Sequence, residues 1–209
     1  MGTPTIKRAV LNRYTTFPVL LDMLQRKKLV LLSPKSWEDR NDAEIILKYQ
    51  EKKAITSILS LCFSQGDETV HHWKTFSNGP SGCCIEFNKT KLFQILNKVP
   101  GLIHGSVAYR RLANIQKNKV PIEYIPFTKR WAYRVEEEYR LIYETDQVME
   151  FFEIEIPLSI INRVTISQHM PQQIFNTIKQ YLKKASGNPD SKVYKSTLYE
   201  NTRWINAFK

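Results

Sequence analysis

A set of short apolar runs limits what this chain of 209 residues can fold into. They are LVLLS (29–33), LSLCFS (59–64), CCIEF (83–87) and EYRLIY (138–143). Such brief, continuous runs are typical of strands buried on both faces. Helical stretches separate them without the regular βαβ alternation of a parallel sheet. The pattern therefore predicts an α+β fold, a single domain over 1–209 with a split, mainly antiparallel central sheet flanked by helices. The four runs are its expected interior strands.

The stretches between these runs complete the predicted order of elements. Thr16 is expected to cap a helix that opens with Phe17 and Pro18. Further helices are predicted over 43–58, 70–76, 89–99 and 171–186, after a polar loop over 36–44. Further strands are predicted over 105–111, 127–144, 149–157, 160–167 and 191–202.

The chain is basic, with 31 lysines and arginines against 20 acids, a net charge of +11 and a pI near 9.5. This balance favours a polyanionic partner, such as nucleic acid, an anionic membrane surface or a phosphorylated ligand. The alternative is that the chain is simply basic and has no polyanionic partner. The cations gather in residues 103–134, where Glu123 is the acid. We predict nucleic-acid binding by the residues Arg110, Arg111, Lys117 and Lys119.

Several kinds of site are excluded by what the sequence lacks. It has no dinucleotide-binding or P-loop glycine motif, no GxSxG and no HExxH. Three cysteines make no disulfide framework, and the histidines lack zinc-ligand spacing, so no metal is expected. Cys83 and Cys84 are expected to be packed, with a pair between one of these thiols and His71 or His72 as the alternative. No apolar run is long enough to span a membrane, and the first residues lack the apolar core of a signal peptide. We therefore expect a cytoplasmic protein without membrane contact.

Three adjacent glutamates, 136–138, open the last apolar run. Glutamate is depleted in strands, and neighbouring carboxylates repel one another. In a strand, Tyr139 and Leu141 share one face, which makes the better core face, while Glu138 and Arg140 share the other. We expect Glu138 and Arg140 to point into solvent or a cleft. An exposed ion pair on an ordinary sheet face is the structural alternative.

The order of several blocks resembles a bacterial family catalogued as domain of unknown function 2971. The blocks are NRYTTFPVLLDMLQRKKLVLLSP, SWEDRNDAE, CFS, HHWKTFSNGPSGCCIEF and WAYRVEEEYRLIY, which together cover nearly the whole chain. No single block is specific, but their order and spacing are. The family name itself implies no activity.

A second resemblance does imply one. RYTTFPVLLDMLQRKKL is similar to the opening of DarT-type ADP-ribosyltransferase toxins, and EYRLI is similar to the later strand that carries their catalytic glutamate. The resemblance implies NAD as substrate, with Arg13 as the NAD-binding arginine and Glu138 as the catalytic residue. Where the toxins have a histidine after the threonine, this chain has Thr16.

The chemistry of NAD cleavage suits these residue types. Breaking the bond to nicotinamide builds positive charge on the ribose, which a carboxylate such as Glu138 stabilises. Arg13, near a helix start, could hold the pyrophosphate. Expected lining or stacking residues are Tyr14, Thr15, Trp73 and Phe76, with Glu136, Arg140 and His72 in support. We predict that Arg13 and Glu138 face one another across a cleft.

Two other functions stay open at this point. One is a metal-dependent nuclease, in which Asp39, Asp42 and Glu44 join Glu136 or Glu138 around Mg²⁺, with Lys129 or Arg140 as phosphate clamp. A solvated turn is the plainer interpretation of those aspartates. The other is a non-catalytic nucleic-acid-binding module of a defence system, using the pairs Tyr109–Arg110 and Trp131–Tyr133–Arg134. For Trp131, packing in the core is the expected alternative. A partner protein, either an antitoxin or another component of a defence system, is consistent with a toxin role and with an anti-phage defence role.

Overall fold

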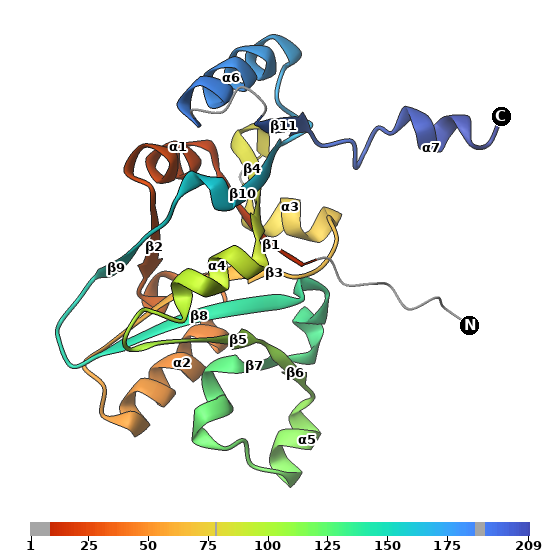
Figure 1. Ribbon diagram of the computed structural model, residues 1–209. Helices are drawn as coiled ribbons and strands as arrows, with labels where there is room; N and C mark the ends of the chain where they lie inside the picture. Colours follow the sequence, from red (N-terminus) through yellow and green to blue (C-terminus); the bar gives the residue numbers. More distant parts are fainter. Residues whose placement is uncertain (1–8, 78, 187–190) are drawn as a thin grey trace. The chain divides into compact units, whose positions relative to one another are not determined.

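The computed structural model describes residues 9–77, 79–186 and 191–209, and the chain packs as two compact units (Figure 1). The first unit contains Lys28–Gly66 and Thr90–Ile156, and the second contains Ala9–Lys27, Asp67–Lys89 and Pro157–Lys209. Residues 1–8, part of the stretch expected to lack a signal peptide, lie outside the described residues. The prediction of one domain over 1–209 stays a prediction.

The first unit is built on antiparallel strands in the order β9-β2-β3-β8-β5. Their bounds are β2 (Lys28–Leu32), β3 (Ser57–Ser64), β5 (Leu102–Ser106), β8 (Glu138–Thr145) and β9 (Phe151–Glu155). A short parallel pair, β6 (Ala108–Arg110) and β7 (Thr128–Arg130), accompanies them. The helices are α2 (Arg40–Lys53), α4 (Lys89–Leu96) and α5 (Leu112–Lys117), with 3-10 turns η1 (Pro34–Ser36), η3 (Ile122–Phe127) and η4 (Trp131–Glu136).

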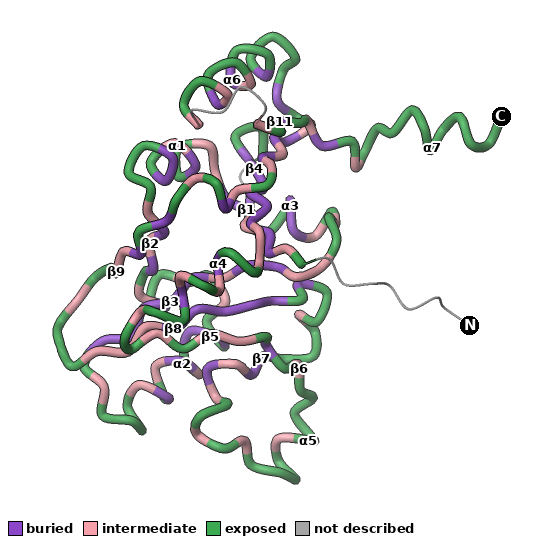
Figure 2. Tube along the Cα trace, in the orientation of Figure 1, coloured by how far each residue is buried: buried purple, intermediate pink, exposed green. Residues whose placement is uncertain are grey.

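Helices cover both faces of β8. On one face, Ile46 and Tyr49 of α2 pack with Ile142 in a buried cluster. On the other, Phe93 of α4 stacks on Tyr139 with ring centroids 5.3 Å apart. Figure 2 shows the resulting buried run along β8. The sequence-based choice of one core face and one open face is therefore wrong for this strand, because α2 closes the second face.

The second unit contains strands in the order β11-β10-β4-β1, antiparallel except for the β10–β11 pair. Their bounds are β1 (Val10–Thr16), β4 (Gly82–Asn88), β10 (Ile161–Ile166) and β11 (Lys192–Lys195). The helices are α1 (Phe17–Arg26), α3 (Val70–Phe76), α6 (Gln172–Ala185) and α7 (Thr202–Asn206), with 3-10 turns η2 (Gly79–Ser81) and η5 (Leu158–Ile160). Apolar side chains of α1 and α6 are buried, whereas α7 is exposed along its length (Figure 2).

The predicted fold class is confirmed: strands and helices are mixed, and the strands are mainly antiparallel. All four apolar runs are interior strands, β2, β3, β4 and β8. No helix in the described ranges is long and apolar enough to cross a membrane. Helix α1 opens at Phe17 as predicted, although the Thr16 side chain makes no capping hydrogen bond.

Three predicted elements are wrong at their boundaries, a loop, a helix and a strand. The loop over 36–44 already contains the start of α2, because the Asp39 carboxylate accepts a hydrogen bond from the Asn41 backbone N–H at 3.1 Å and caps the helix. That helix ends at Lys53, where Ala54 adopts a left-handed conformation, rather than running to residue 58. The strand predicted over 127–144 is interrupted by η4, and Glu137, with φ of 41°, separates that turn from β8.

Candidate active site

Five charged side chains form a buried cluster in the first unit. They are Asp42 of α2, Lys129 of β7, Glu136 of η4, and Glu138 and Arg140 of β8. None of these side chains is more than 8% exposed. Charged groups are rarely buried unless they are paired, so the cluster is a distinctive feature of this unit.

The three adjacent glutamates are separated by the backbone into two buried residues and one exposed residue. Glu137 takes the left-handed conformation and is exposed, and its carbonyl accepts a hydrogen bond from Gln65 N at 2.8 Å. Glu136 and Glu138 both reach Lys129 Nζ, at 2.7 and 3.2 Å. A shared ammonium group thus relieves the repulsion that the sequence alone suggests.

Arg140 is the most deeply buried member of the cluster, with 0% of its surface exposed. Its guanidinium donates to both Asp42 oxygens, at 3.2 and 2.7 Å, in a fork-like pairing. Its Nε donates to Glu138 Oε1 at 2.7 Å, and it also donates to the Pro126 carbonyl at 2.9 Å. The Trp37 ring lies 5.1 Å from the guanidinium carbon. Arg140 is therefore fixed on several sides.

The electrostatics of the cluster keep Glu138 ionised. Burial acts to raise the pKa of its carboxyl group, but the positive charges of Arg140 and Lys129 outweigh burial and bring the pKa to about 2. Burial lowers the pKa of Lys129, yet the neighbouring carboxylates raise it well above its ordinary value. Burial raises the pKa of Asp42, so Glu138 is the stronger acid of these two carboxyl groups.

The expectation that Glu138 and Arg140 point into open solvent is wrong, since both are buried. A cleft that reaches Glu138 stays a prediction. Lys129 and Arg140 are not free to clamp a phosphate, because both are held by carboxylates. Glu136 and Arg140 do lie beside Glu138, as supporting residues were expected to. Nothing in the sequence indicated that Lys129 pairs with both Glu136 and Glu138, because the contact between Lys129 and Glu136 depends on the turn η4.

Of the carboxylates in the nuclease hypothesis, Asp42, Glu136 and Glu138 converge on Lys129 Nζ, at 3.3, 2.7 and 3.2 Å. Asp39 caps α2, Glu44 is exposed, and Asp42 is paired with Arg140. Among the residues that the structure describes, no group of three histidine, cysteine or acidic side chains could hold a metal ion. Lys129 thus takes the place at the centre of these carboxylates that the nuclease hypothesis gives to Mg²⁺.

A cluster of rings in the second unit brings together four of the residues predicted from sequence. Tyr14 stacks on His72, with centroids 4.8 Å apart and an interplanar angle of 6°, and meets the edge of Trp73 at 5.6 Å. Phe76 lies 6.3 Å from His72. His72 and Trp73 are buried, whereas Phe76 is 41% exposed. The ring faces with which Tyr14 and His72 stack on each other are therefore already covered within the protein.

Arg13 and Thr15 lie on the face of β1 opposite Tyr14, because neighbouring strand residues alternate. Thr15 faces Cys83 across the β1–β4 ladder, and the charge of Arg13 acts on that thiol. Burial nevertheless raises the pKa of Cys83 to about 12, and it raises that of Cys84 further. Both cysteines are packed thiols without a disulfide, as expected. The predicted meeting of Arg13 with Glu138 joins residues of different units and stays a prediction.

The predicted nucleic-acid-binding residues of the first unit are exposed. They are Arg110, Arg111, Lys117 and Lys119. Next to them, Trp131 is 41% exposed and has Arg111 and Arg134 at 5.5 and 5.1 Å from its ring centroid. The expectation that Trp131 packs in the core is wrong, because η4 leaves it exposed beside two arginines.

Comparisons with known proteins identify structural neighbours only. No family model and no curated protein matches the sequence. A solved structure of Thermus sp. 2.9 DarT in complex with ADP-ribosylated ssDNA is similar, with 12% identity, a TM-score of 0.48, and coverage of 94% of this chain and 98% of that chain. The same protein in complex with NAD+ gives 9% identity, a TM-score of 0.45, and coverage of 90% and 95%. TM-scores below 0.5 do not establish a shared activity, and the resemblance to domain of unknown function 2971 stays a prediction.

Proposed function

We propose that this protein is an NAD-dependent ADP-ribosyltransferase-like enzyme, with Glu138 as its catalytic carboxylate. The observation that carries the proposal is the charge of the buried cluster, which places three carboxylates against two cations. Such an acid-rich, dehydrated site favours a ligand that becomes positive during reaction. Cleavage of the glycosidic bond of NAD creates that charge on the ribose.

Glu138 retains hydrogen-bonding capacity for a substrate. A carboxylate offers about four lone-pair positions. Among the described residues, Arg140 Nε and Lys129 Nζ donate to Glu138, and the nearby Cys62 thiol helps to lower the pKa of its carboxyl group. In the proposed mechanism, a lone pair that these two donors do not use accepts a hydrogen bond from a ribose hydroxyl, and this bond strengthens as the ribose gains oxocarbenium character. Lys129 and Arg140 keep the carboxylate ionised and fix its direction.

We further propose that Arg13 binds the NAD pyrophosphate, together with the N-terminus of α1. Arg13 comes shortly before this ten-residue helix, whose N-cap side chain leaves the first N–H groups uncapped. Arg13→Ala should raise the Kd for NAD by roughly tenfold to a hundredfold, since a charge-assisted hydrogen bond contributes about 1.5–3 kcal/mol. Calorimetric titration with NAD measures the effect. Arg26→Ala, at the opposite end of the helix, is the matched control, and an equal loss there would argue against the assignment.

We propose nucleic acid as the acceptor, because the exposed cations of the first unit suit a phosphate backbone. Replacing Arg110, Arg111, Lys117 and Lys119 together with alanine should weaken oligonucleotide binding regardless of base sequence. The slope of log K against log salt should flatten, by about 0.7 for each phosphate of a single strand that is no longer neutralised. Fluorescence anisotropy over a salt series measures both. Alanine at Lys35, Lys48, Lys52 and Lys98, which are exposed elsewhere in the unit, is the control. Equal losses in both variants would reject a localised interface.

Incubation of the protein with NAD labelled in the adenylate half tests the proposed function. Separate reactions contain single-stranded DNA, RNA, protein or buffer alone. Label transfer to a nucleic acid with release of nicotinamide is the expected result, and release without transfer would indicate hydrolysis by the same site. Neither release nor transfer under any condition would reject the enzyme. A place in a bacterial toxin or anti-phage defence system, with an antitoxin or another partner protein, belongs to the same proposal.

A non-catalytic nucleic-acid-binding module is the second candidate function. The arrangement of Arg111, Trp131 and Arg134 favours it, since an exposed indole beside guanidinium groups can stack on a base while the cations meet phosphates. Oligonucleotide binding without NAD turnover would support this function over the first.

A further inference from the structure

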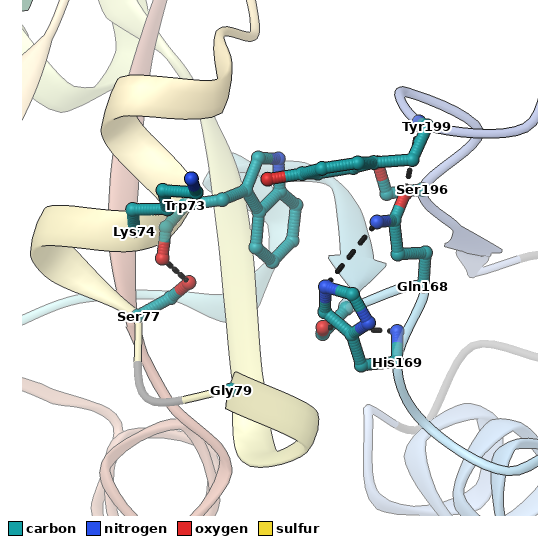
Figure 3. Close-up of a pocket in the computed structure, with 9 residues that line it drawn as sticks. Trp73, Lys74, Ser77, Gly79, Gln168, His169, Ser196 and Tyr199 are labelled. Atoms are coloured by element: carbon teal, nitrogen blue, oxygen red, sulfur yellow. Dashed lines mark hydrogen bonds between the residues drawn. The ribbon is translucent and has the colours of Figure 1, made fainter.

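A pocket of about 240 Å³ lies within the second unit, where α3 faces the turn after β10 and the segment that follows β11 (Figure 3). The rings of Trp73, His169 and Tyr199 border the space. The catalytic proposal for Glu138 uses none of this pocket.

The buried part of the pocket combines an indole with hydroxyl groups. Trp73, Ser77, Ser167 and Ser196 are each no more than 8% exposed. The Trp73 indole N–H donates to Glu68 Oε1 at 2.6 Å, which fixes the ring by its edge. Ser167 Oγ accepts the His169 backbone N–H at 3.3 Å, and its own hydrogen has no acceptor among the described residues. The floor thus offers a fixed aromatic surface with polar groups beside it.

The rim holds a second ring in place without burying it. Tyr199 is 50% exposed, yet its backbone N–H donates to Gln168 Oε1 at 3.0 Å. The next turn is also tied, because the Leu198 N–H donates to Ser196 Oγ at 3.3 Å. Lys74 lines the same opening and is exposed. An exposed ring on a tethered backbone loses little conformational freedom when a flat ligand stacks on it.

We propose that this pocket binds one nucleotide unit. The base lies against Trp73 and Tyr199, its polar edge meets the serine hydroxyls, and the phosphate lies toward Lys74. The Ser77 hydroxyl already donates to the Trp73 carbonyl and the Ser196 hydroxyl to Glu68. A wholly apolar ligand would therefore leave the buried Ser167 hydroxyl hydrogen without an acceptor, which is unfavourable. A nucleotide combines a flat ring, polar edges and an attached anion. These match the aromatic rings, the hydroxyl groups and the lysine of the pocket. The unit can come from a free mononucleotide, the adenylate half of NAD or a single-stranded nucleic acid. The proposal does not rest on ADP-ribosyl transfer.

Titration calorimetry with AMP, NAD and a short single-stranded oligonucleotide tests the pocket without any turnover. Tyr199→Ala should weaken the ligand that binds by roughly tenfold, the effect expected for losing one stacking ring. Tyr199→Phe keeps the ring and should bind as the unchanged protein does. Tyr194→Ala is the matched control, since Tyr194 is also 50% exposed but does not line the pocket. Thermal melting of each variant confirms that it is folded.

A second variant tests the phosphate. Lys74→Ala should weaken AMP by several-fold while leaving adenosine, which lacks the anion, nearly unchanged. Saturable binding that depends on Tyr199 supports the pocket, and the tightest of the three ligands identifies the source of the nucleotide. The proposal is overturned if none of them binds saturably, or if Tyr199→Ala and Tyr194→Ala bind equally well. Loss of label transfer in Glu138→Gln with this binding intact would separate the two proposals.

Discussion

Replacing Glu138 with glutamine is expected to reduce nicotinamide release from NAD by about a hundredfold or more. Removing one preorganised electrostatic partner of a charged transition state typically costs a factor of this size. Glutamine keeps the shape of the side chain but has no negative charge to offer the developing oxocarbenium ion. The Kd for NAD should change by less than about threefold, because the carboxylate acts mainly in the transition state. Rates under saturating NAD, with Kd from calorimetry, measure the two effects separately.

Glu86→Gln provides the matched control for this experiment. Glu86 is also a strand glutamate paired with an arginine, at 2.8 Å from Arg163, but it lies in the second unit. Turnover should survive that change. Because Glu138→Gln also weakens pairing with Lys129 and Arg140, each rate is corrected for the folded fraction measured by circular dichroism at the assay temperature. Undiminished release by a folded Glu138→Gln variant would rule out the catalytic role.

The elements of this chain were predictable where the signal was local. Continuous apolar runs identified β2, β3, β4 and β8, because burial on both faces leaves little room for polar residues. The start of α1 was predictable from Pro18, because the fixed φ of proline suits the first turn of a helix. The break within 127–144 was not predictable, since it depends on the left-handed conformation of Glu137 rather than on a glycine or proline.

The candidate site was predictable in its residues but not in its surroundings. Glu138 and Arg140 stood out as charges within an apolar run, and both belong to the buried cluster. Their burial depends on α2, which is far away in the sequence and brings Asp42 to the same guanidinium group. Strand periodicity reports which residues share a face, but it does not report whether a distant helix covers that face. The exposure of Trp131 was missed for the converse reason, since a 3-10 turn replaced the expected strand.

Replacing Arg140 with methionine is expected to lower the free energy of unfolding by about 3–5 kcal/mol, the usual cost of removing one partner from a buried ionic network. Methionine fills much of the space but leaves Asp42 and Glu138 without their closest cation and the Pro126 carbonyl without its donor. Urea denaturation at neutral pH measures the loss. Arg140→Lys keeps the charge but not the fork, so its loss should be intermediate.

A matched control and the pH dependence distinguish the loss of charge pairing in Arg140→Met from a packing defect. Arg163→Met removes an arginine that is 38% exposed from its pair with Glu86, and the expected loss is below about 1 kcal/mol.

In the unchanged protein, the pKa of Glu138 lies at about 2, below its ordinary value of 4.5, so its contribution to stability is present above pH 4.5 and is lost as the pH falls toward 2. Without Arg140, the folded-state pKa values of the buried carboxyl groups rise, and protonation relieves their unpaired charge. The stability gap between Arg140→Met and the unchanged protein should therefore narrow as the pH is lowered from 7 toward 4. A gap that is independent of pH, or equal losses for Arg140→Met and Arg163→Met, would mean that packing rather than charge makes Arg140 important.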